Sequence, residues 1–481
     1  MFLSHRQCRG PNDPARSSRR PSSAPIPTLA ALLTLISGNL ADKASAQAPN
    51  IILLMADDLG WGDVGFNGHR VLKTPSLDAM ARDGLRFERF YSAAPVCSPT
   101  RGSCMTGRHP FRYGIPFANT GHMKLQERTL AELMKDLGFA TGHFGKWHLG
   151  TLTKTQKDSN RGGPKNVAHY SPPWVSGFET CFSTEAKVPT WDPMLKPGSS
   201  TPYGTAYWTD QGVQETENLE GDDSRVIMDR AIPFVRAAAK EKKPFFAVIW
   251  FHAPHLPVVA GPRHLAMYEN VSNEKTRHYY GCVTALDEQV GRLRKELRDL
   301  KIADRTMLWF CSDNGPEGKN SAPGKTGGLR GRKRSLFEGG VRVPGVVVWP
   351  EHVQPGTETT VPACTSDYLP TILDVLGVER ADDRPLDGVS LLPLFEGKMH
   401  RRPQPIFFES RAEVSLVDNH WKLIGSAKKQ QFSLFDLSKD RAESNDMAAK
   451  HPNLVQKMSA QIDEWRASCS RSAEGKDYNG Q

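Results

Sequence analysis

Several features that define common protein classes are absent from this sequence. None of its 8 cysteines forms a Cys-x-x-Cys pair, which argues against a zinc ribbon. The apolar stretch at residues 29–36 is too short to cross a bilayer as a helix, so we expect no membrane span. There is also no internal repeat and no run of Lys and Arg interleaved with aromatic residues. A nucleic-acid partner is therefore not expected.

The overall composition is that of a soluble globular protein. Hydrophobic residues make up 38% and charged residues 24% of the chain. A length of 481 residues allows a large core and more than one average domain. The formal net charge is +9, of which the six basic and two acidic residues of positions 1–46 contribute +4. The remaining +5 is a mild excess that suits an anionic substrate.

The first 48 residues have the pattern of a targeting segment. An Arg-rich start precedes the apolar core at 29–36, and Ala44-Ser-Ala and Ala46-Gln-Ala both fit an A-x-A cleavage site. We predict a signal segment over residues 1–48 and export to the periplasm or beyond; a disordered tail is the alternative. Six cysteines remain after Cys8 and Cys97 are set aside, and some could form disulfides in an exported protein.

Apolar runs and amphipathic segments alternate along most of the chain. This alternation predicts βαβ units, and hence an α/β fold with a large, mainly parallel sheet and helices on both faces. The expected strands are residues 50–55, a short strand ending at 146, 244–251, 305–311 and 341–349. The expected helices are residues 74–84, 129–137, 224–240, 274–300 and 366–376. We assign all of them to a domain at 49–400.

Two regions depart from this alternation. Residues 151–222 lack periodicity and are rich in Pro, Gly, Trp and Tyr, which predicts an ordered loop facing the substrate. Its aromatic residues could stack on sugar rings or could simply fill space. Beyond residue 400 the elements become shorter, at 405–409, 420–424 and 432–436, and a helix follows at 452–467. We predict a second domain at 401–481, a small antiparallel sheet with one helix.

Polar residues follow several of the apolar runs. They are Asp57 and Asp58, Lys146 to His148, His252 to His255, and Asp313 with Asn314. Functional residues of open α/β sheets gather at the carboxyl ends of strands, so we expect these groups to meet. The three Asp and the Asn offer only oxygen atoms, which suits Ca²⁺, with Mg²⁺ less favoured. Helix caps and turns are the alternative for these residues.

The segment at residues 95–103 contains the cysteine of greatest interest. It reads as a loop that enters a helix, with Ser98 as the N-cap and Pro99 as the first helical residue. Cys97 would then lie at the positive end of the helix, and Arg101 one turn further on the same face. Such a place suits an anion. The alternative is a small cysteine buried at a helix start.

These residues carry a family resemblance. Cys97-x-Pro-x-Arg101 followed by Gly-Ser resembles the signature of the formylglycine-dependent, or type I, sulfatases, which have an alkaline phosphatase-like fold. Residues 145–150, 253–257 and 332–344 resemble further motifs of that family, in the family's order. The resemblance implies that a formylglycine-generating maturation enzyme oxidises Cys97 to an aldehyde. The hydrate of this aldehyde would attack sulfate esters.

The resemblance also implies a role for each matching residue. Asp57, Asp58, Asp313, Asn314 and the modified residue 97 would bind Ca²⁺. Arg101 would steady the hydrate, and Lys146 and Lys333 would contact the sulfate. His148 would take a proton from the second hydroxyl of the hydrate, and His255 would protonate the leaving oxygen. His252 matches no required position and is interpreted as structural. For the basic run around Lys333, a solvated charged face is the alternative.

The predicted function is therefore that of a sulfatase, an enzyme that removes sulfate from a sulfated carbohydrate or a small sulfate ester. A phosphonate monoester or phosphodiester hydrolase of the same superfamily is the alternative within this fold. A two-zinc phosphatase is less expected, because the strand ends lack a His-rich ligand set. A non-catalytic carbohydrate-binding protein would explain the aromatic loops but not the set of motifs.

Overall fold

The computed structural model describes residues 48–210, 212–380 and 382–478. The predicted signal segment lies outside these residues except for its last position. Within the described ranges, no helix is both long enough and apolar enough to cross a membrane. All 7 cysteines of these ranges are free thiols, so none of the disulfides considered above is present there.

A nine-stranded sheet forms the centre of the fold, in the order β11-β2-β10-β8-β1-β7-β4-β5-β6. β1 pairs in parallel with β7 and β8, and β4 pairs in parallel with β7 and β5, whereas β10, β2 and β6 include antiparallel pairs. The bounds are β1 (Asn50–Ala56), β2 (Leu85–Phe87), β4 (Ala140–Lys146), β5 (Thr180–Thr184), β6 (Tyr207–Thr209), β7 (Phe245–Trp250), β8 (Thr306–Ser312), β10 (Gly345–Val348) and β11 (Thr357–Thr359). The predicted mainly parallel sheet is confirmed.

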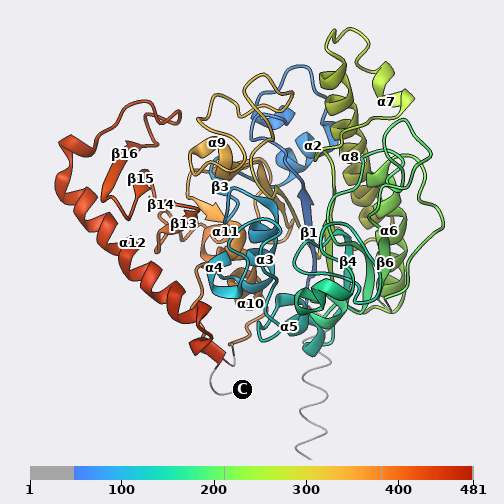
Figure 1. Ribbon diagram of the computed structural model, residues 1–481, viewed down its shortest axis with the longest axis horizontal. Helices are drawn as coiled ribbons and strands as arrows, with labels where there is room; N and C mark the ends of the chain where they lie inside the picture. Colours follow the sequence, from blue (N-terminus) through green and yellow to red (C-terminus); the bar gives the residue numbers. More distant parts are fainter. Residues whose placement is uncertain (1–47, 211, 381, 479–481) are drawn as a thin grey trace, which may run out of the picture. The chain divides into compact units, whose positions relative to one another are not determined.

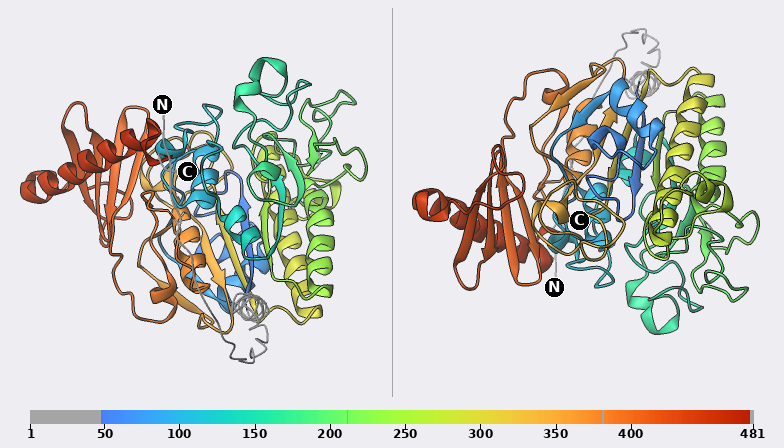
Figure 2. Two further views of the ribbon diagram at one scale, coloured as in Figure 1. Left: turned by 90° about the horizontal axis from the view of Figure 1, so that it is seen from below. Right: turned by 90° about the horizontal axis from the view of Figure 1, so that it is seen from above.

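Helices cover both faces of this sheet (Figures 1 and 2). Side chains alternate along a strand, so Ile52 and Leu54 of β1 face one layer while Ile51 and Leu53 face the other. The first layer contains α2 (Pro75–Asp83), α6 (Asp223–Lys240) and α8 (Glu274–Asp299). The second contains α3 (Cys97–Thr106), α5 (Leu130–Asp136) and α10 (Tyr368–Val375). Because β1 is buried on both faces, its sequence is continuously apolar.

The C-terminal part forms a four-stranded antiparallel sheet in the order β13-β14-β15-β16 (Figure 1). The strands are β13 (Ile406–Ser410), β14 (Glu413–Asp418), β15 (Trp421–Ser426) and β16 (Gln431–Asp436), with α12 (Pro452–Ala473) packed on one face. The other face packs against Tyr91, Leu336 and Val341. A small sheet β12-β3-β9 lies at this contact, formed by Ala363–Cys364, Phe90–Tyr91 and Arg342–Val343. The predicted antiparallel sheet with one helix is confirmed, with β14 as an additional strand.

Two predicted segments need correction. The single strand expected at 341–349 is divided at Pro344 into β9 and β10, which belong to different sheets; proline cannot donate a ladder hydrogen bond. The loop expected at 151–222 contains β5 and β6, two short strands at the edge of the central sheet.

The remaining short elements are η1 (Gly65–Asn67), α4 (Pro110–Tyr113), η2 (Pro164–His169), η3 (Pro173–Val175), α7 (Pro262–Ala266), α9 (Glu338–Val341), η4 (Thr365–Asp367), α11 (Leu392–Phe395), η5 (Ala448–Lys450) and η6 (Lys476–Tyr478).

Candidate active site

The polar residues that follow the central strands meet at one edge of the sheet. β1 ends at Ala56, directly before Asp57 and Asp58, and β8 ends at Ser312, directly before Asp313 and Asn314. Ala56 and Ser312 are paired across the two strands. β4 ends at Lys146, and the turn with His252 to His255 follows β7. Because these strands are parallel, their carboxyl ends bring the groups together, as the sequence predicts.

Each carboxylate at this edge lies close to a positive charge. Lys146 Nζ is 2.5 Å from Asp57 Oδ2, and Lys333 Nζ is 2.5 Å from Asp58 Oδ1. Arg101 Nη2 is 2.6 Å from Asp313 Oδ2. Burial alone would raise the pKa of Asp57, but Lys146, His255 and Arg101 hold it well below its ordinary value. Burial and the charge of Asp57 raise the pKa of Asp313 to about 7.

Three oxygen atoms of this cluster accept no hydrogen bond from any described residue. They are Asp57 Oδ1, Asp58 Oδ2 and Asn314 Oδ1, all in buried side chains. The Asn314 amide points its Nδ2 at Asp58 Oδ1, 2.6 Å away, which leaves its own oxygen free. Asp57, Asp58 and His255 offer ligand atoms that lie within 4.8 Å of one another. Orphaned buried oxygens are costly without a partner, so this donor set fits a hard cation such as Ca²⁺.

Cys97 is the first residue of α3 and is 3% exposed. The predicted N-cap is wrong: Val96 occupies that position in extended conformation, and Ser98 lies inside the first turn with its hydroxyl unpaired among the described residues. No side chain caps α3, so the N-terminal N–H groups are not blocked at the point where Cys97 lies. Burial raises the pKa of the Cys97 thiol above its ordinary value, although Lys146 and Lys333 oppose this. An unmodified Cys97 is therefore a protonated, weakly nucleophilic thiol.

Arg101 lies one turn into α3, as predicted, and is completely buried. Besides its ion pair with Asp313, it donates from Nη1 to the backbone oxygen of Lys146, 3.0 Å away. Its guanidinium also lies 5.3 Å from the centre of the Trp250 ring. These contacts tie α3 to the ends of β4, β7 and β8, which fixes Cys97 relative to the carboxylates.

His148 is held by a residue that the sequence did not indicate. His148 Nε2 is 2.8 Å from Asn119 Oδ1, and Asn160 Nδ2 donates to the same oxygen over 3.3 Å. Nε2 therefore carries the proton, and Nδ1 has no partner in the described ranges. Burial and the charge of Lys146 keep the pKa of His148 well below its ordinary value, so the ring is neutral and can accept a proton.

His255 faces the same cluster from the turn after β7. Its Nδ1 lies 2.7 Å from the backbone oxygen of Leu256, so Nδ1–H donates there and Nε2 is directed toward Asp58, 3.7 Å away. Burial lowers its pKa to about 4, more than the charges of Asp57 and Asp58 raise it. His252, in contrast, is fully buried between Asp223 Oδ2 at 2.8 Å and Thr184 Oγ1 at 2.7 Å. This geometry agrees with its interpretation as a structural residue.

A pocket of about 340 Å³ opens at this edge, and Cys97, Lys146, His148, His255 and Lys333 all line it. The sequence did not indicate the following lining residues: Phe117, Asn119, Asn160, Lys187, Glu317 and Arg334. Asn160 and Lys187 belong to the segment 151–222, which the sequence predicts to face the substrate, and Arg334 belongs to the basic run around Lys333. The other three come from loops without a periodic pattern, so no sequence signal pointed to them. No Trp or Tyr of residues 151–222 lines the pocket, and Trp208 is buried in the core. Of the two alternatives for these aromatic residues, filling space agrees with this geometry, whereas the lining of the pocket gives no support for stacking on a sugar.

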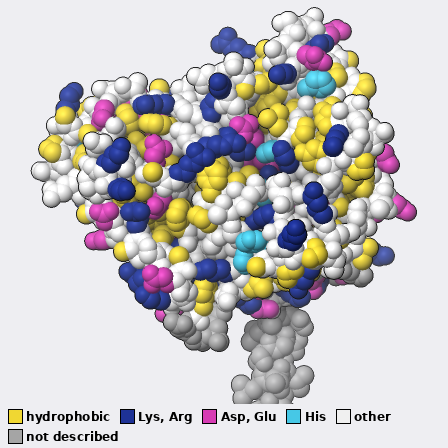
Figure 3. Space-filling model, viewed as in Figure 1, with side chains coloured by type: hydrophobic (Ala, Val, Ile, Leu, Met, Phe, Trp, Pro, Cys, Tyr) yellow, Lys and Arg dark blue, Asp and Glu magenta, His cyan; other side chains and the backbone are white. Residues whose placement is uncertain are grey.

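Lys333 and its two neighbours in the chain have different surroundings in the structure. Lys333 points at Asp58, Arg334 is exposed and pairs with Glu317, and Arg332 is buried outside this pocket. The basic run is therefore not a uniform solvated face. On the face drawn in Figure 3, Lys and Arg side chains form a band across the middle, next to a His side chain.

Comparison with known families decides the class of this protein. The family model described as "Sulfatase" matches residues 49–378, and the model "N-sulphoglucosamine sulphohydrolase, C-terminal" matches residues 331–468. The first match covers well over half of the chain. The chain belongs to the sulfatase family. The prediction of an enzyme of this family is confirmed.

Individual relatives of this sulfatase agree with the family match. The chain is 33% identical to N-acetylgalactosamine-6-sulfatase of Sus scrofa over 395 residues, which cover 77% of this chain and 71% of the relative. It is also 33% identical to arylsulfatase A of Bos taurus over 402 residues, covering 79% and 74%. Among solved structures, Ps i-CgsB in complex with k-i-k-neocarrahexaose has a TM-score of 0.78 and 29% identity, covering 88% of this chain and 93% of that one.

The same fold also occurs in an enzyme of another class. The structure of phosphonate monoester hydrolase of Agrobacterium radiobacter matches with a TM-score of 0.60 and 19% identity, covering 88% of this sulfatase and 96% of that chain. This likeness concerns the fold, and it confirms the expected alkaline phosphatase-like architecture. The reaction and the substrate do not follow from this fold; they depend on the residues of the candidate active site.

Proposed function

We propose that this chain hydrolyses sulfate esters of carbohydrates through a formylglycine made from Cys97. The observation that carries the proposal is the position of Cys97, at the N-terminus of the ten-residue helix α3 and in one pocket with Lys146 and Lys333. A helix N-terminus and two lysines attract an anion such as sulfate. The raised pKa of the thiol supports the need for conversion, because the unmodified side chain is a poor nucleophile.

A bound Ca²⁺ is part of this proposal, with Mg²⁺ less suited. Its ligands would be Asp57, Asp58, Asp313, Asn314 and an oxygen of the modified residue 97. The three oxygens without hydrogen-bond partners in the described residues support this assignment, since Ca²⁺ accepts mixed carboxylate and amide oxygens. When bound, the cation supplies positive charge that stabilises sulfate oxygens as negative charge develops.

Lys146, Lys333 and Arg101 would hold the sulfate and residue 97 in place before the reaction begins. Lys146 and Lys333 are ion-paired and 1% and 4% exposed at their side chains, so they lose little freedom when substrate enters. The modified residue 97 supplies a hydrated aldehyde, whose two hydroxyl groups allow both attack and release of sulfate. Arg101 keeps α3 in register with the carboxylates through its contacts to Asp313 and Lys146.

The two histidines would handle the protons. His148 is neutral, with Nε2–H bound to Asn119, so its Nδ1 is the atom that would accept a proton from the hydrate. His255 would protonate the leaving oxygen from Nε2, because Nδ1 is bound to Leu256. Its pKa of about 4 leaves it mostly neutral in the free protein. The negative charge of an entering sulfate ester raises the pKa of His255 and so favours the proton it has to give.

Further expectations belong to the same proposal. The relatives named above include an N-acetylgalactosamine-6-sulfatase, which supports a sulfated sugar, or a small sulfate ester, as the substrate. A formylglycine-generating enzyme would be the partner that matures Cys97. We also propose export through the segment at 1–48, a catalytic domain at 49–400 and a C-terminal domain at 401–481.

Mass spectrometry of the tryptic peptide of residues 90–101 tests the proposal. The chain is produced together with a formylglycine-generating enzyme and assayed with 4-nitrophenyl sulfate and a panel of sulfated glycans. We expect an aldehyde in place of the thiol, and sulfate release that Cys97→Ala abolishes. Cys104→Ala on the same helix removes a buried thiol outside the pocket and serves as the matched control. It should retain activity.

Two results would overturn this assignment. One is an active preparation that carries an unmodified thiol at position 97. The other is hydrolysis of a phosphonate monoester or phosphodiester at a higher kcat/KM than any sulfate ester, which would favour the rival hydrolase. An aldehyde-free chain that binds sulfated glycans and releases no sulfate would indicate a non-catalytic carbohydrate-binding protein.

A further inference from the structure

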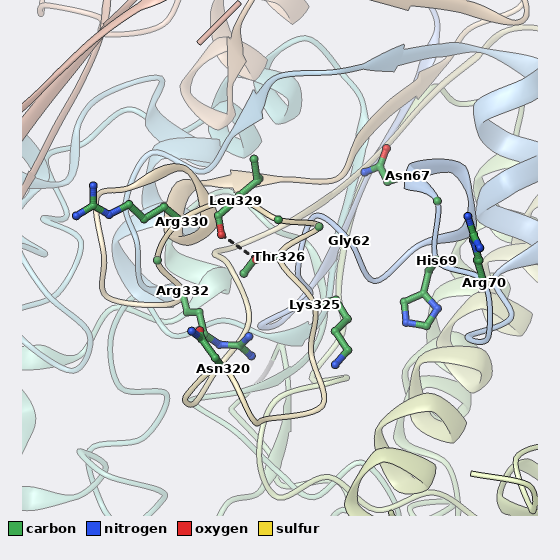
Figure 4. A pocket seen from close by; sticks show the side chains of 14 residues that line it. Gly62, Asn67, His69, Arg70, Asn320, Lys325, Thr326, Leu329, Arg330 and Arg332 are labelled. Atoms are coloured by element: carbon green, nitrogen blue, oxygen red, sulfur yellow. Dashed lines mark hydrogen bonds between the residues drawn. The ribbon is translucent and has the colours of Figure 1, made fainter. Parts of the chain in front are cut away.

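A second, larger pocket lies beside the candidate active site. It has a volume of about 650 Å³ and is formed by the segment after β1 and the loop that leads to Lys333 (Figure 4). Its 14 lining residues include four cationic side chains, Arg70, Lys325, Arg330 and Arg332, together with His69. None of the 14 is acidic. The pocket therefore has a positive potential that its own walls do not neutralise.

The four cations of this pocket are not neutralised by carboxylate partners. Within residues 48–210, 212–380 and 382–478, none of the four forms an ion pair with Asp or Glu. Arg330 lies over the Phe337 ring at 3.8 Å and donates to a backbone oxygen of Glu443. Arg70 and Lys325 are exposed. In Figure 4, Lys325 lies between Arg332 and the segment of His69 and Arg70. Their charge is free to act on a ligand.

Arg332 gives the pocket a buried cation that is not fully satisfied. The residue is 9% exposed, and its one described hydrogen bond runs from Nη2 to the backbone oxygen of Glu317 over 2.9 Å. Its Nε has no partner in the described part of the chain. A guanidinium holds five N–H donors, and burying them unpaired is costly, so a buried arginine of this kind is suited to an anionic group.

Consecutive residues connect this pocket to the candidate active site. Arg332 lines the larger pocket, and Lys333 lines the pocket of Cys97. Glu317 marks the boundary, since its backbone oxygen binds Arg332 while its carboxylate lies 3.7 Å from Lys333 Nζ. The two pockets therefore share a boundary made by Arg332, Lys333 and Glu317, and we infer that one extended ligand could occupy both.

Two consecutive glycines, Gly327 and Gly328, form part of the lining of this pocket. Gly327 and Gly328 both have positive φ angles, +68° and +85°. A Cβ on Gly327 would lie 2.6 Å from a ring atom of Trp61, whereas a Cβ on Gly328 would meet nothing within 4 Å. Gly328 is exposed and has no side chain, so its backbone can be approached closely by a ligand.

We propose that the pocket of Arg70, Lys325 and Arg332 binds a second anionic group, a sulfate ester or a carboxylate, on the same glycan whose sulfate ester enters the pocket of Cys97. The inference rests on the proposed function and narrows the substrate to a glycan with at least two anionic groups. Small aryl sulfates reach only the first pocket and gain nothing from the second.

The double variant Arg70→Ser/Lys325→Ser tests this, because both side chains are exposed and neither lines the pocket of Cys97. Binding of the full chain to dextran sulfate, carboxymethyl dextran and uncharged dextran is measured by affinity electrophoresis. We expect the dissociation constant for at least one charged dextran to rise about tenfold in the double variant. Uncharged dextran should bind to neither protein. The two charged polymers show whether sulfate or carboxylate is preferred.

Lys428→Ser/Lys429→Ser is the matched control, since it removes the same charge from an exposed turn of the C-terminal sheet. The control should bind the charged dextrans like the wild type, and kcat/KM for 4-nitrophenyl sulfate should be unchanged in both double variants. Equal loss of binding in both variants, or undiminished binding in Arg70→Ser/Lys325→Ser, would overturn the inference. A failure of the proposed function would appear separately, as a wild-type chain that binds these polymers but releases no sulfate.

Discussion

Two of the buried clusters of charged side chains in this protein differ in a way that can be followed atom by atom. The site cluster consists of Asp57, Asp58, Asp313, Asn314, Lys146, Arg101 and Lys333. The inter-sheet cluster consists of Glu338, Lys422, Glu443, Arg342 and Tyr91, and it lies where the C-terminal sheet packs on the rest of the fold. Both contain carboxylates, lysine and arginine at or near full burial. They differ in how many side-chain oxygens lack a hydrogen-bond partner among the described residues, which is three in the site cluster and one in the inter-sheet cluster.

In the inter-sheet cluster every carboxylate oxygen lies within 2.9 Å of a donor, although the contact to Glu443 Oε1 is an ion pair without hydrogen-bond geometry. Lys422 Nζ lies 2.9 Å from Glu338 Oε1 and 2.9 Å from Glu443 Oε1. Glu338 Oε2 accepts from Tyr91 over 2.9 Å, and Glu443 Oε2 accepts from the backbone N–H of Glu338 over 2.7 Å. Burial alone would raise the pKa of Glu338, but Lys422 and Arg342 hold it below its ordinary value.

This difference distinguishes a charge cluster that stabilises the fold from a charge cluster that can bind a ligand. A buried ion pair is favourable only when its remaining lone pairs are also satisfied. The inter-sheet cluster comes closer to this condition, because its one oxygen without a hydrogen bond, Glu443 Oε1, still pairs with Lys422 at 2.9 Å. The site cluster leaves three oxygens unpaired among the described residues and opens to a pocket. Substitutions in the first should therefore mainly change stability, and substitutions in the second should mainly change activity.

The largest expected effect is the loss of stability in Lys422→Met. Without Lys422, Glu338 and Glu443 lose the cation that both of them contact at 2.9 Å. Removing one member of a buried charge cluster costs roughly 3–5 kcal/mol of unfolding free energy. Urea unfolding followed by tryptophan fluorescence measures it. For the fraction that stays folded we expect kcat/KM within about threefold of wild type, because Lys422 does not reach the pocket of Cys97.

Lys439→Met is the matched control for this variant. Lys439 is 84% exposed at its side chain and lies 3.7 Å from Asp436, so its removal should change stability by less than about 0.5 kcal/mol. If the two variants were equally stable, the inter-sheet cluster would not hold the fold as proposed and the comparison would fail.

The next largest effect is expected for Lys146→Met, which should lose activity and not mainly stability. Removing a preorganised positive charge from the sulfate position should lower kcat/KM by about 10²–10³-fold. Stability should fall much less than in Lys422→Met, because Arg101 Nη2 remains 3.5 Å from the same Asp57 oxygen. Parallel measurement of 4-nitrophenyl sulfate hydrolysis and urea unfolding checks both statements. Lys154→Met, which alters an exposed lysine, should change neither. A large stability loss with normal activity would make Lys146 a structural residue.

The contrast between the clusters also shows how far the sequence could be read. The site carboxylates follow continuous apolar runs, so strand ends and the parallel sheet together predicted that Asp57, Asp58, Asp313 and Asn314 would meet. Asn119 could not be found this way, because it comes from an aperiodic loop and its contact to His148 depends on tertiary packing. The choice of Ser98 as the N-cap failed because the helix begins two residues earlier than residue preference at a cap predicts, at Cys97 instead of Pro99.

Two structural features that we did not predict could have been recognised in the sequence. Pro344 interrupts the apolar run at 341–349, and proline inside a run argues against one continuous strand. Lys422 and Ile424 are two residues apart in β15, so their side chains lie on the same face of the strand, which packs inward. A lysine on an inward face predicts buried carboxylate partners, but the sequence does not say which ones. Glu338 lies 84 residues from Lys422 along the chain, and the contact between Glu443 and the backbone of Glu338 spans 105 residues, so both are beyond any local pattern.

Binding of Ca²⁺ should stabilise the protein through the site cluster and not through the inter-sheet cluster, and this effect should be smaller than the two above. If the unpaired oxygens bind Ca²⁺, a concentration about 100 times the dissociation constant adds about 2.7 kcal/mol to the free energy of unfolding. We expect the thermal midpoint of the wild type and of Lys422→Met to rise with Ca²⁺, and to fall after chelation. Asp58→Asn should lose the effect, since it weakens one donor and leaves the fold otherwise intact. An undiminished shift in Asp58→Asn would place the ion elsewhere.

The smallest expected effect is that of Tyr91→Phe, which removes one donor from the inter-sheet cluster. Tyr91 donates to Glu338 Oε2, and Arg342 Nη1 stays 3.5 Å from that oxygen, so the carboxylate remains partly satisfied. We expect a loss of about 1 kcal/mol at neutral pH. Tyr203→Phe is the control, because its half-buried hydroxyl makes no hydrogen bond within the described residues.

The pH dependence of this loss tests its cause. The Tyr91 hydrogen bond helps to keep the pKa of Glu338 below its ordinary value, so its stabilisation is present above the ordinary carboxyl pKa. It disappears as the pH falls through the lower pKa of the folded state, where Glu338 takes up a proton. Urea unfolding of both proteins along a pH series should therefore show the difference between wild type and Tyr91→Phe shrinking toward acid. A difference that does not change with pH would mean that Tyr91 contributes by packing, and that the ionised Glu338 does not depend on its hydroxyl.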